Sequence, residues 1–377
     1  MSWKLPLFRI YWDESDIEAV NSVIRRGSFW ADGPEITEFE RDIAGFVGRE
    51  HGVAFSNGTA ALHALMLAYD IGPGDEVIVP SFTFISTANA PLFTGARPVF
   101  AEVEGRYFGM DPNDVRKRIT ERTKAILPIH YGGHPFQVDE LSEIARDSGV
   151  LLLEDAAEAL GALHGERQVG SFGDAAMFSF CQNKVVSTGE GGAVVTDDEE
   201  LVGRLRLIRS HGRGQRTSYF DSTVGPDYVT LGYNFRMPTV LAALGRSQLA
   251  KIESIIAMRR QAASRITRAL KSLDGIRAPL EMEGCRHVYQ LYTVLLDNSD
   301  ARDGLKSHLE ERGIMSKVYF DPVHLTELYR TKHGHASGDL PVTEDLGKRV
   351  LTLPLFPGMK DDEAKTLTDA IKEYMGG

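Results

Sequence analysis

Lys184 is the residue of this chain whose position best suits covalent chemistry. It follows the strand-like run 175–180 and lies just before the glycine-rich turn 189–192. A lysine amine held between a buried strand and a tight turn can form a Schiff base with an aldehyde and can also move protons. A single lysine in a loop is more often a solvated charge, so Lys184 gains meaning only from the residues that accompany it.

Asp155 and the Gly58-Thr59 pair supply two further kinds of group. Asp155 ends the apolar run 151–155, where a carboxylate can be held at a fixed distance from a protonated ring nitrogen. Gly58 and Thr59 open a helix-like segment, where backbone amides and a hydroxyl can bind a phosphate. Each signal is weak alone, because strand-end aspartates and glycine caps are common. Together they match the aldehyde, ring nitrogen and phosphate of pyridoxal phosphate (PLP).

Seven short apolar runs must position these groups. The runs are continuous rather than alternating, as expected for strands buried on both faces of a largely parallel sheet. Helical patterns lie between most of them, for example at 139–146. Ligands of such sheets collect at the carboxyl ends of the strands, where Asp155 and the Gly58-Thr59 turn fall. The strands are expected at 53–55, 77–79, 99–100, 125–127, 150–153, 177–180 and 193–195.

The pattern changes near residue 245. A long helix is expected from Gln248 onward, followed by a strand at 288–296 and helices at 303–312 and 361–374. The sequence therefore predicts an α/β protein of two domains. The predicted domains are a cofactor-binding large domain at 1–244, which includes the N-terminal segment, and a smaller α+β domain at 245–377.

Composition narrows the class of protein. The 377 residues are 42% hydrophobic and 25% charged, with a formal net charge of −11 and no basic block, which argues against nucleic acid and anionic membranes as partners. Cys181 and Cys285 are too few for a disulfide framework, and the N-terminus lacks the apolar region of a signal peptide. No apolar run reaches the length of a membrane span. We expect a cytoplasmic protein without a metal site, with Cys181 as a small packing residue beside Lys184.

Several strings, in order over most of the chain, resemble the DegT/StrS-type sugar-nucleotide aminotransferases. The resemblance implies the aspartate-aminotransferase-like fold, known as fold type I, in a homodimer with active sites at the subunit interface. The strings are residues 33–35 (GPE), 55–63 (FSNGTAALH), 80–84 (PSFTF), 154–158 (EDAAE), 178–184 (FSFCQNK), 189–192 (GEGG) and 232–237 (GYNFRM).

The resemblance also implies roles for individual residues. Lys184 would bind the cofactor covalently, and Asp155 would contact its ring nitrogen. Phe84 would stack on the ring, Glu158 would lie near the ring hydroxyl, and Asn234 would reach the phosphate from the partner subunit. The other phosphate contacts would come from Gly58, Thr59, Ala60 and Ser179.

The implied reaction is transamination of a nucleotide-linked keto-sugar with L-glutamate as the amino donor. Glu158 favours amination at carbon 4 over carbon 3, hence a 4-keto-6-deoxyhexose as substrate. His324 aligns loosely with a substrate-side histidine of the family, with a packing or surface histidine as the alternative. Arg236 either contacts the sugar nucleotide or caps a helix.

Alternative functions predict different residues at the same positions. A sugar dehydratase of this family would carry histidine in place of Lys184. A non-catalytic regulatory relative would be free to lose Lys184, Asp155 or Thr59, and all three are present. Fold-type I enzymes that process amino acids or cysteine would carry different strings around the lysine. A sugar 3-aminotransferase remains the alternative closest to the preferred reading.

Overall fold

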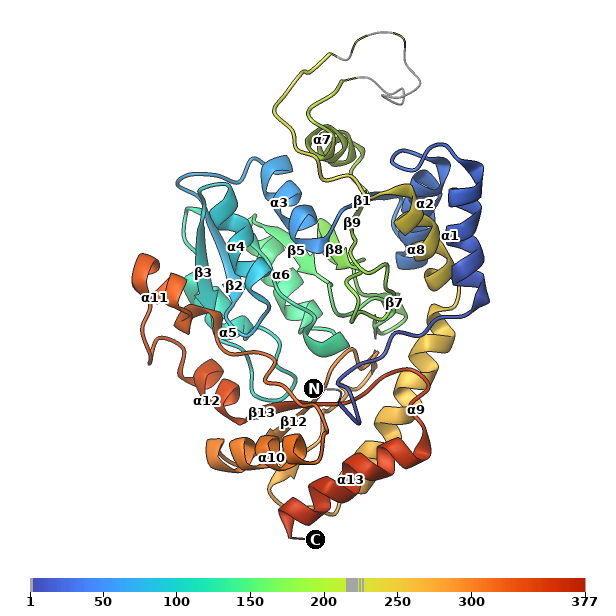
Figure 1. Cartoon of the computed structure of the whole chain (residues 1–377). Coiled ribbons are helices and arrows are strands. Elements are labelled where there is room, and N and C mark those ends of the chain that lie inside the picture. Colours follow the sequence, from blue (N-terminus) through green and yellow to red (C-terminus); the bar gives the residue numbers. More distant parts are fainter. Residues whose placement is uncertain (1–2, 215–222, 224, 226, 377) are drawn as a thin grey trace.

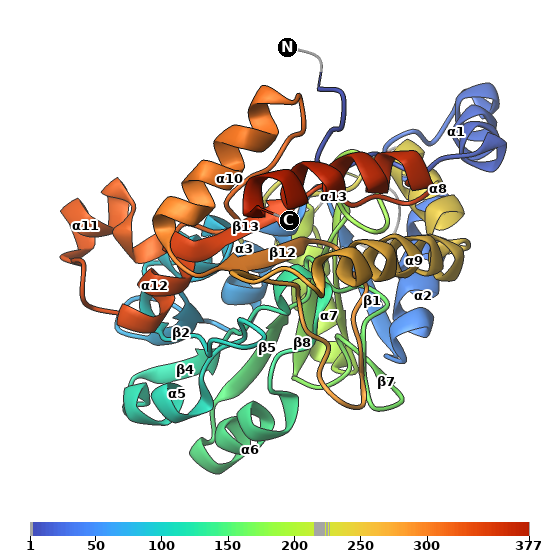
Figure 2. The same ribbon diagram turned by 90° about the horizontal axis from the view of Figure 1, so that it is seen from below.

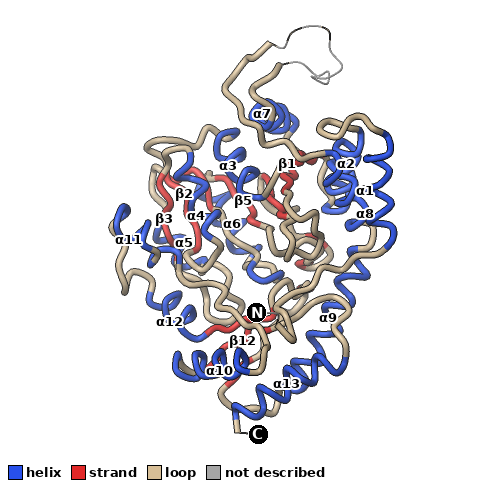
Figure 3. Tube along the Cα trace, viewed as in Figure 1, coloured by secondary structure: helices blue, strands red, loops and turns tan. Residues whose placement is uncertain are grey.

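The structure, a computed structural model, describes residues 3–214, 223, 225 and 227–376. A seven-stranded sheet lies at its centre, and Figure 3 shows these strands in red, surrounded by blue helices. A smaller sheet lies below the large one in Figure 1. The large sheet consists of β1 (His51–Phe55), β2 (Glu76–Pro80), β3 (Arg97–Ala101), β4 (Thr123–Ile126), β5 (Leu151–Asp155), β8 (Ala175–Ser179) and β9 (Gly192–Thr196).

The strand order across the large sheet is β1-β9-β8-β5-β4-β2-β3. β9 runs antiparallel to both of its neighbours, and the other four pairs are parallel. Each strand overlaps one of the seven predicted apolar runs. The predicted fold class, an α/β protein with a mostly parallel seven-stranded sheet, is therefore confirmed.

Helices bury both faces of this sheet, which explains why its strands read as continuous apolar runs. Leu152 and Ile126 pack with α5 and α6, whereas their chain neighbours Leu153 and Ala125 lie in the cluster formed with α3, α4 and α7. One face is covered by α2 (Pro34–Val47), α5 (Pro112–Arg118) and α6 (Val138–Ser148), and the other by α3 (Gly58–Ala68), α4 (Ile85–Phe93) and α7 (Glu199–Arg209).

A second core surrounds the smaller sheet. Figure 2, the view from below, shows helices lying along this C-terminal unit. Leu5 pairs with Ile314 and is buried in this core, so the start of the described chain packs with the C-terminal unit. The unit consists of β10 (Ile276–Arg277), β12 (Tyr292–Leu296), β13 (Val350–Leu353), α9 (Ile252–Leu270), α10 (Ser299–Glu311) and α13 (Asp361–Met375). The predicted domain boundary after residue 244 falls inside α8 (Thr239–Leu249) and stays a prediction.

Two predicted elements of the C-terminal region are wrong in extent. The helix expected from Gln248 onward is broken at Lys251, whose φ of −111° and ψ of 12° are not helical, and α9 begins at the next residue. The Lys251 side chain bonds Asp13 at 2.6 Å. The strand expected at 288–296 begins only at Tyr292. Arg259 donates to the carbonyls of Tyr289 and Gln290, which takes these groups out of strand pairing.

Short elements complete the described part of the chain. α1 packs on α8 at the right-hand side of Figure 1. Not one of the helices described is long and apolar enough to cross a membrane. The elements not yet named are α1 (Glu14–Arg26), β6 (Leu163–His164), β7 (Arg167–Gln168), β11 (Cys285–Arg286), α11 (Glu327–His333), α12 (Pro341–Arg349), and the 3-10 turns η1 (Tyr131–Gly133) and η2 (Val323–Leu325).

Candidate active site

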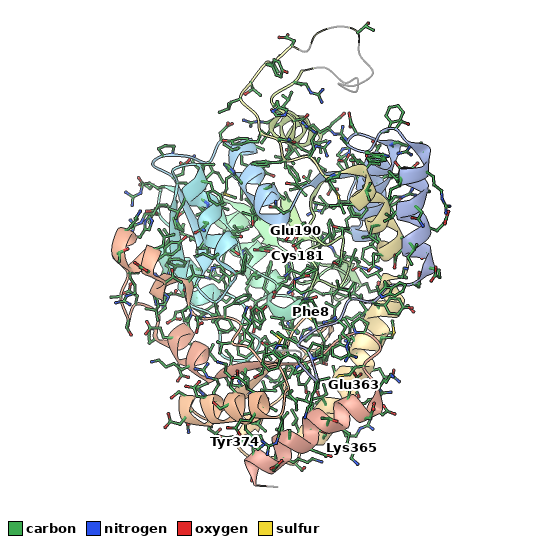
Figure 4. The ribbon with its side chains drawn as sticks, viewed as in Figure 1. Phe8, Cys181, Glu190, Glu363, Lys365 and Tyr374 are labelled. Atoms are coloured by element: carbon green, nitrogen blue, oxygen red, sulfur yellow. The ribbon has the colours of Figure 1, made fainter. Side chains whose placement is uncertain are left out.

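A cavity of about 690 Å³ lies at the carboxyl ends of the central strands. Segments from distant parts of the chain line it: the starts of α3 and α4, the ends of β5 and β8, the loop after β8, and pieces of the N-terminal and C-terminal regions. Figure 4 labels three lining residues, Phe8, Cys181 and Glu190, in the middle of the molecule. Its volume exceeds those of three other cavities in the described part of the chain, which are about 20, 10 and 390 Å³.

Lys184 reaches this cavity from a closed loop after β8. The loop is held by backbone bonds between Phe180 and Thr188 and between Phe180 and Gly191. The Lys184 side chain is only 14% exposed, and its Nζ donates to Oε1 of Glu158 at 3.3 Å. The second oxygen of Glu158 accepts from the backbone N–H of Gly132 at 2.9 Å. The amine is therefore held beside a buried carboxylate at the cavity wall.

Asp155 presents a buried carboxylate to the same cavity from the end of β5. Thr87 Oγ1 donates to one carboxylate oxygen at 2.6 Å, and the N–H of Ala157 donates to the other at 3.1 Å. Burial raises the pKa of the Asp155 carboxyl, while these two bonds and the charge of Lys184 oppose that rise. The arrangement provides a fixed acceptor for a cationic group in the cavity.

The amino end of α3 forms the third part of the site. Asn57 caps the helix, and Gly58 and Thr59 line the cavity. A Cβ on Gly58 would lie 3.1 Å from Met177 Sδ and 3.2 Å from Ser179 Cβ, so this turn lies directly on β8 and leaves no room for a side chain. The exposed amides and the positive end of the helix dipole suit a phosphate.

Ala60 is an exception among the predicted phosphate contacts. Its N–H donates to Asn57 Oδ1 at 2.8 Å, so the cap already uses this donor, and Ala60 does not line the cavity. The phosphate contact of Ala60 stays a prediction, and its amide is engaged by the helix cap. Ser179 does line the cavity, as does Thr59, whose hydroxyl bonds Ser86 at 2.7 Å.

Phe84 forms part of the cavity wall and is 56% exposed, a large value for an aromatic side chain. It precedes α4 as the N-cap residue, and its ring contacts that of Phe320 from the C-terminal region at 6.4 Å between centroids. An open ring face at this position suits stacking on a flat heterocycle. Cys181 also lines the cavity, and its Sγ donates to Glu190 at 3.7 Å.

Almost the whole chain matches a known protein family. The model of the DegT/DnrJ/EryC1/StrS aminotransferase family matches residues 11–372. The chain belongs to this family. It is a PLP-dependent aminotransferase, and the predicted cofactor is confirmed, since solved structures of close fold neighbours include PLP and PMP forms at TM-scores of 0.91 and 0.92.

Three related proteins illustrate the range of the family. A UDP-N-acetyl-3-dehydro-α-D-glucosamine 3-aminotransferase of Acidithiobacillus ferrooxidans is 38% identical and covers 90% of this chain and 88% of its own. A GDP-perosamine synthase of Caulobacter vibrioides is 36% identical over 91% of each chain. The crystal structure of DesV from S. venezuelae is 35% identical, with a TM-score of 0.91 and full coverage of both chains.

The residues of this aminotransferase fit PLP without rearrangement of the main groups. The cavity holds an amine for the aldehyde, a buried carboxylate for the ring nitrogen, amides at a helix start for the phosphate and an open aromatic face for the ring. These groups correspond to Lys184, Asp155, the Gly58-Thr59 turn and Phe84. Their individual roles remain proposals, taken up below.

Asn234 and Arg236 lie outside the cavity lining of their own chain. Asn234 is exposed and pairs with Ser210 in a short bridge, and Arg236 donates to the Ser210 hydroxyl at 3.2 Å. The structure does not bring either residue to Lys184 within one chain. For Asn234 this agrees with the expected position in a partner subunit's site, which stays a prediction, and Arg236 caps no helix in the described contacts.

His324 is held in a buried network of this aminotransferase. Its side chain is fully buried, Nδ1 bonds the Ser81 hydroxyl at 2.7 Å, and Nε2 bonds Glu344 at 3.2 Å. It does not line the cavity, and both ring nitrogens are occupied. This network joins the loop after β2 to α12, which favours the packing alternative, and the predicted substrate-side role stays a prediction.

Replacing Glu344 with glutamine tests this structural role. Burial opposes ionisation of Glu344, but bonds from Ser337, Gly338 and His324 outweigh it and lower its pKa from 4.5 to about 2. A lowered carboxyl pKa stabilises the fold above pH 4.5, and this contribution is lost as pH falls through about 2. We expect Glu344→Gln to lower the free energy of unfolding at pH 7 by about 1–3 kcal/mol and progressively less towards pH 2.

The measurement is urea unfolding at several pH values, paired with steady-state kinetics. The Michaelis constant for the sugar nucleotide is expected to stay unchanged, because Glu344 and His324 lie outside the cavity lining. A large rise in that constant with unchanged stability would restore His324 to the substrate side.

Sequence reasoning missed several lining residues. Ser86 and Thr87 follow Phe84 in the first turn of α4, and a polar pair after a recognised aromatic residue is the one signal that pointed to them. Phe8, Tyr319 and Phe320 come from segments far away in sequence, and no local pattern marks them. Their positions depend on how the N-terminal segment and the C-terminal unit dock on the large sheet.

Proposed function

We propose that this protein transfers an amino group from L-glutamate to a nucleotide-linked 4-keto-6-deoxyhexose, giving an amino sugar for glycan, polysaccharide or antibiotic synthesis. One observation carries the proposal: a single large cavity holds the amine of Lys184, the carboxylate of Asp155 and the amino end of α3. The cavity has room for a cofactor and a sugar together, since its volume is at the middle of the range for small-molecule sites.

Bound PLP supplies an aldehyde that accepts an amine and a ring that withdraws electrons from the reacting carbon. The chain's own residues hold and direct that chemistry. We assign the phosphate to the amides of Gly58 and Thr59 and the hydroxyl of Ser179, and the ring face to Phe84. Asp155 holds a positive charge at the ring nitrogen, which is the role its fixed, buried carboxylate suits.

Lys184 has two tasks in this assignment. Its amine would anchor bound PLP and, when free, would take up the proton from the donor carbon and return it. The Glu158 carboxylate at 3.3 Å can hold the displaced amine near the reacting atoms, and the bond from Gly132 keeps that carboxylate in place. The half-reaction with the keto-sugar uses the same lysine in the opposite direction.

Part of the cavity wall is aromatic. Phe8, Tyr319 and Phe320 line it, and with the substrate bound these side chains would limit access of water to the reacting atoms. Reduced water access strengthens the electrostatic contacts of Asp155 and Lys184. The apolar wall is also compatible with a deoxygenated sugar, in line with the proposed 6-deoxy substrate.

Position 158 supports amination at carbon 4, and a 3-aminotransferase is the second candidate. It is favoured by the 38% identical relative, whose name specifies a 3-dehydro sugar linked to UDP. The 36% identical relative is named for a GDP-linked sugar, so comparable identity accompanies different nucleotides. The presence of Lys184 disfavours a dehydratase, and the complete set of polar groups disfavours a non-catalytic regulator.

The proposal includes a homodimer whose subunits share their active sites. Among the described residues of one chain that line the cavity, Lys184 is the one cation. Asp155, Glu158 and Glu190 are the acidic lining residues. A diphosphate-linked substrate calls for further donors. Asn234 and Arg236, which lie outside their own chain's cavity, are the candidates to reach a partner's site.

A substrate panel tests the function. The purified protein with PLP is incubated with L-glutamate and with UDP-, GDP- or dTDP-linked 3-keto and 4-keto sugars, and products are identified by mass and by NMR. We expect one 4-keto-6-deoxy sugar nucleotide to be converted at least about tenfold faster than any 3-keto sugar, which is the ratio a few well-placed contacts provide. Preferential conversion of a 3-keto sugar would establish the second candidate, and product without amino transfer would point to a dehydratase.

A further inference from the structure

Three buried side chains form a hydrogen-bonded chain that ends on Asp155. The hydroxyls of Thr83 and Thr87 lie 2.7 Å apart, and Thr87 Oγ1 lies 2.6 Å from Oδ2 of Asp155. Thr83, Thr87 and Asp155 are 1%, 0% and 3% exposed. Water therefore does not compete for these bonds, and each hydroxyl depends on its neighbours in the chain.

The direction of the hydrogen bonds follows from the chemistry of the groups. An ionised carboxylate only accepts, so Thr87 must give its single hydroxyl proton to Asp155. The Thr87 oxygen can then accept, and Thr83 donates to it. Because a bond to a charged acceptor is about twice as strong as a neutral one, the ionised form of Asp155 orders the whole chain.

The position of Thr87 links this chain to the cofactor pocket. Thr87 lies in the first turn of α4, where its N–H bonds the carbonyl of Phe84, the N-cap residue. Both residues line the cavity. One helix turn therefore presents the aromatic wall and the donor to Asp155, so the stacking face and the carboxylate are positioned together.

We propose that Thr87 is a positioning residue that keeps the Asp155 carboxylate ionised and oriented towards the ring nitrogen of PLP, and that Thr83 sets the direction of the Thr87 hydroxyl. The Ala157 N–H fixes the other carboxylate oxygen, so rotation about the side chain is blocked on both sides. This inference rests on the proposed role of Asp155 and adds Thr87, which is not among the predicted site residues.

The electrostatics of the pocket explain why the Asp155 carboxylate needs the Thr87 hydroxyl as a hydrogen-bond donor. Burial is the largest influence on Asp155 and favours its neutral form, and the Thr87 bond is the largest influence that opposes burial. The other charged groups facing Asp155 act in opposite senses: Lys184 favours the carboxylate, and Glu158 disfavours it. Loss of the Thr87 hydroxyl removes support that no other neighbour replaces.

The test uses the full-length protein loaded with PLP labelled with ¹⁵N in the ring. Thr87→Val keeps the shape and removes the hydroxyl, and Thr87→Ser keeps the hydroxyl. We expect Thr87→Val to move the ring ¹⁵N resonance towards that of a neutral pyridine and to weaken cofactor binding by about tenfold to a hundredfold. Thr87→Ser is expected to retain the wild-type resonance and an affinity within about threefold, because the donor to the charged acceptor is conserved.

Two further variants separate positioning from folding. Thr87→Val leaves the buried Thr83 hydroxyl without its acceptor, which by itself lowers stability. The double variant Thr83→Val/Thr87→Val removes both hydroxyls, and we expect it to regain thermal stability while its ring nitrogen remains as in Thr87→Val. If Thr87→Val does not fold, the double variant supplies the spectrum.

Asp155→Asn serves as the reference. If Asp155→Asn shifts the ring resonance and the valine variants do not, Thr87 has no positioning role and the proposal is overturned, while the proposed site stands. If Asp155→Asn itself leaves the resonance and the cofactor affinity unchanged, the assignment of Asp155 fails, and the role of Thr87 fails with it. A neutral-pyridine resonance in both Asp155→Asn and the valine variants supports the proposal.

Discussion

Replacing Lys184 with alanine is expected to lower the rate of transamination by at least about 10³-fold, within the range that positioned acid–base groups contribute. The variant loses both the covalent anchor of the cofactor and the group that moves the proton. We expect the visible absorption band of the bound cofactor to change position, and the response of that band to L-glutamate to disappear. The measurements are single-turnover kinetics and an absorption spectrum of the protein loaded with PLP.

Lys184→Arg is the matched control for charge. Arginine retains a cation beside Glu158 but does not form a bond to the cofactor aldehyde at neutral pH, since its guanidinium stays protonated. We expect Lys184→Arg to be as inactive as Lys184→Ala and to have a higher melting temperature, because Glu158 keeps an ionic partner. Lys365→Ala on α13, labelled far from the cavity in Figure 4, controls for general lysine loss.

Borohydride reduction followed by peptide mapping provides a readout that does not depend on turnover. In the wild-type protein the reduced cofactor is expected on the peptide that contains Lys184. A modified peptide elsewhere, or transamination by Lys184→Ala at more than about a tenth of the wild-type rate, would contradict the assignment, because it lies far outside the expected loss.

The large sheet was predictable because its strands are buried on both faces. Val77, Ile78 and Val79 face opposite sides of β2 in turn, yet all are apolar, and such runs stand out against the helices between them. Lys184, Asp155 and Gly58 were predictable for a related reason. Each follows directly or closely on one of these strands, so local sequence already places it at the ligand-binding edge.

The features that sequence analysis missed depend on contacts across the fold. His324 is held in the interior, where Ser81 and Glu344, 243 and 20 positions away, take both its ring nitrogens. The helix expected from Gln248 breaks at Lys251, whose side chain bonds Asp13 near the N-terminus. Phe8 reaches the cavity because Leu5 pairs beside Ile314 in the C-terminal unit. A local pattern contains no information about such partners, so the aromatic wall could not be anticipated.

Asp155→Asn is expected to lower the rate of transamination by about 10²–10³-fold, the loss typical of removing one preorganised electrostatic contact. The substitution keeps the size and planarity of the side chain and removes its charge. The amide can still accept from Thr87, so the α4 turn is retained, but it offers no negative charge to the ring nitrogen. The measurement is steady-state kinetics at saturating PLP, which separates the loss of rate from weaker cofactor binding.

The same substitution is expected to stabilise the protein without its cofactor. Burial raises the pKa of Asp155 above its usual 3.8, so the folded chain binds this proton more tightly than the unfolded chain does. Stability therefore falls as pH rises from 3.8 through the raised pKa, and asparagine, which does not titrate, escapes that loss. Urea unfolding of the cofactor-free proteins should show Asp155→Asn more stable than wild type at pH 7, with the difference shrinking towards pH 4. If Asp155→Asn is less stable than wild type at pH 7, the fold itself stabilises the Asp155 charge. If the variant is more stable but inactive, the charge is retained for binding the cofactor.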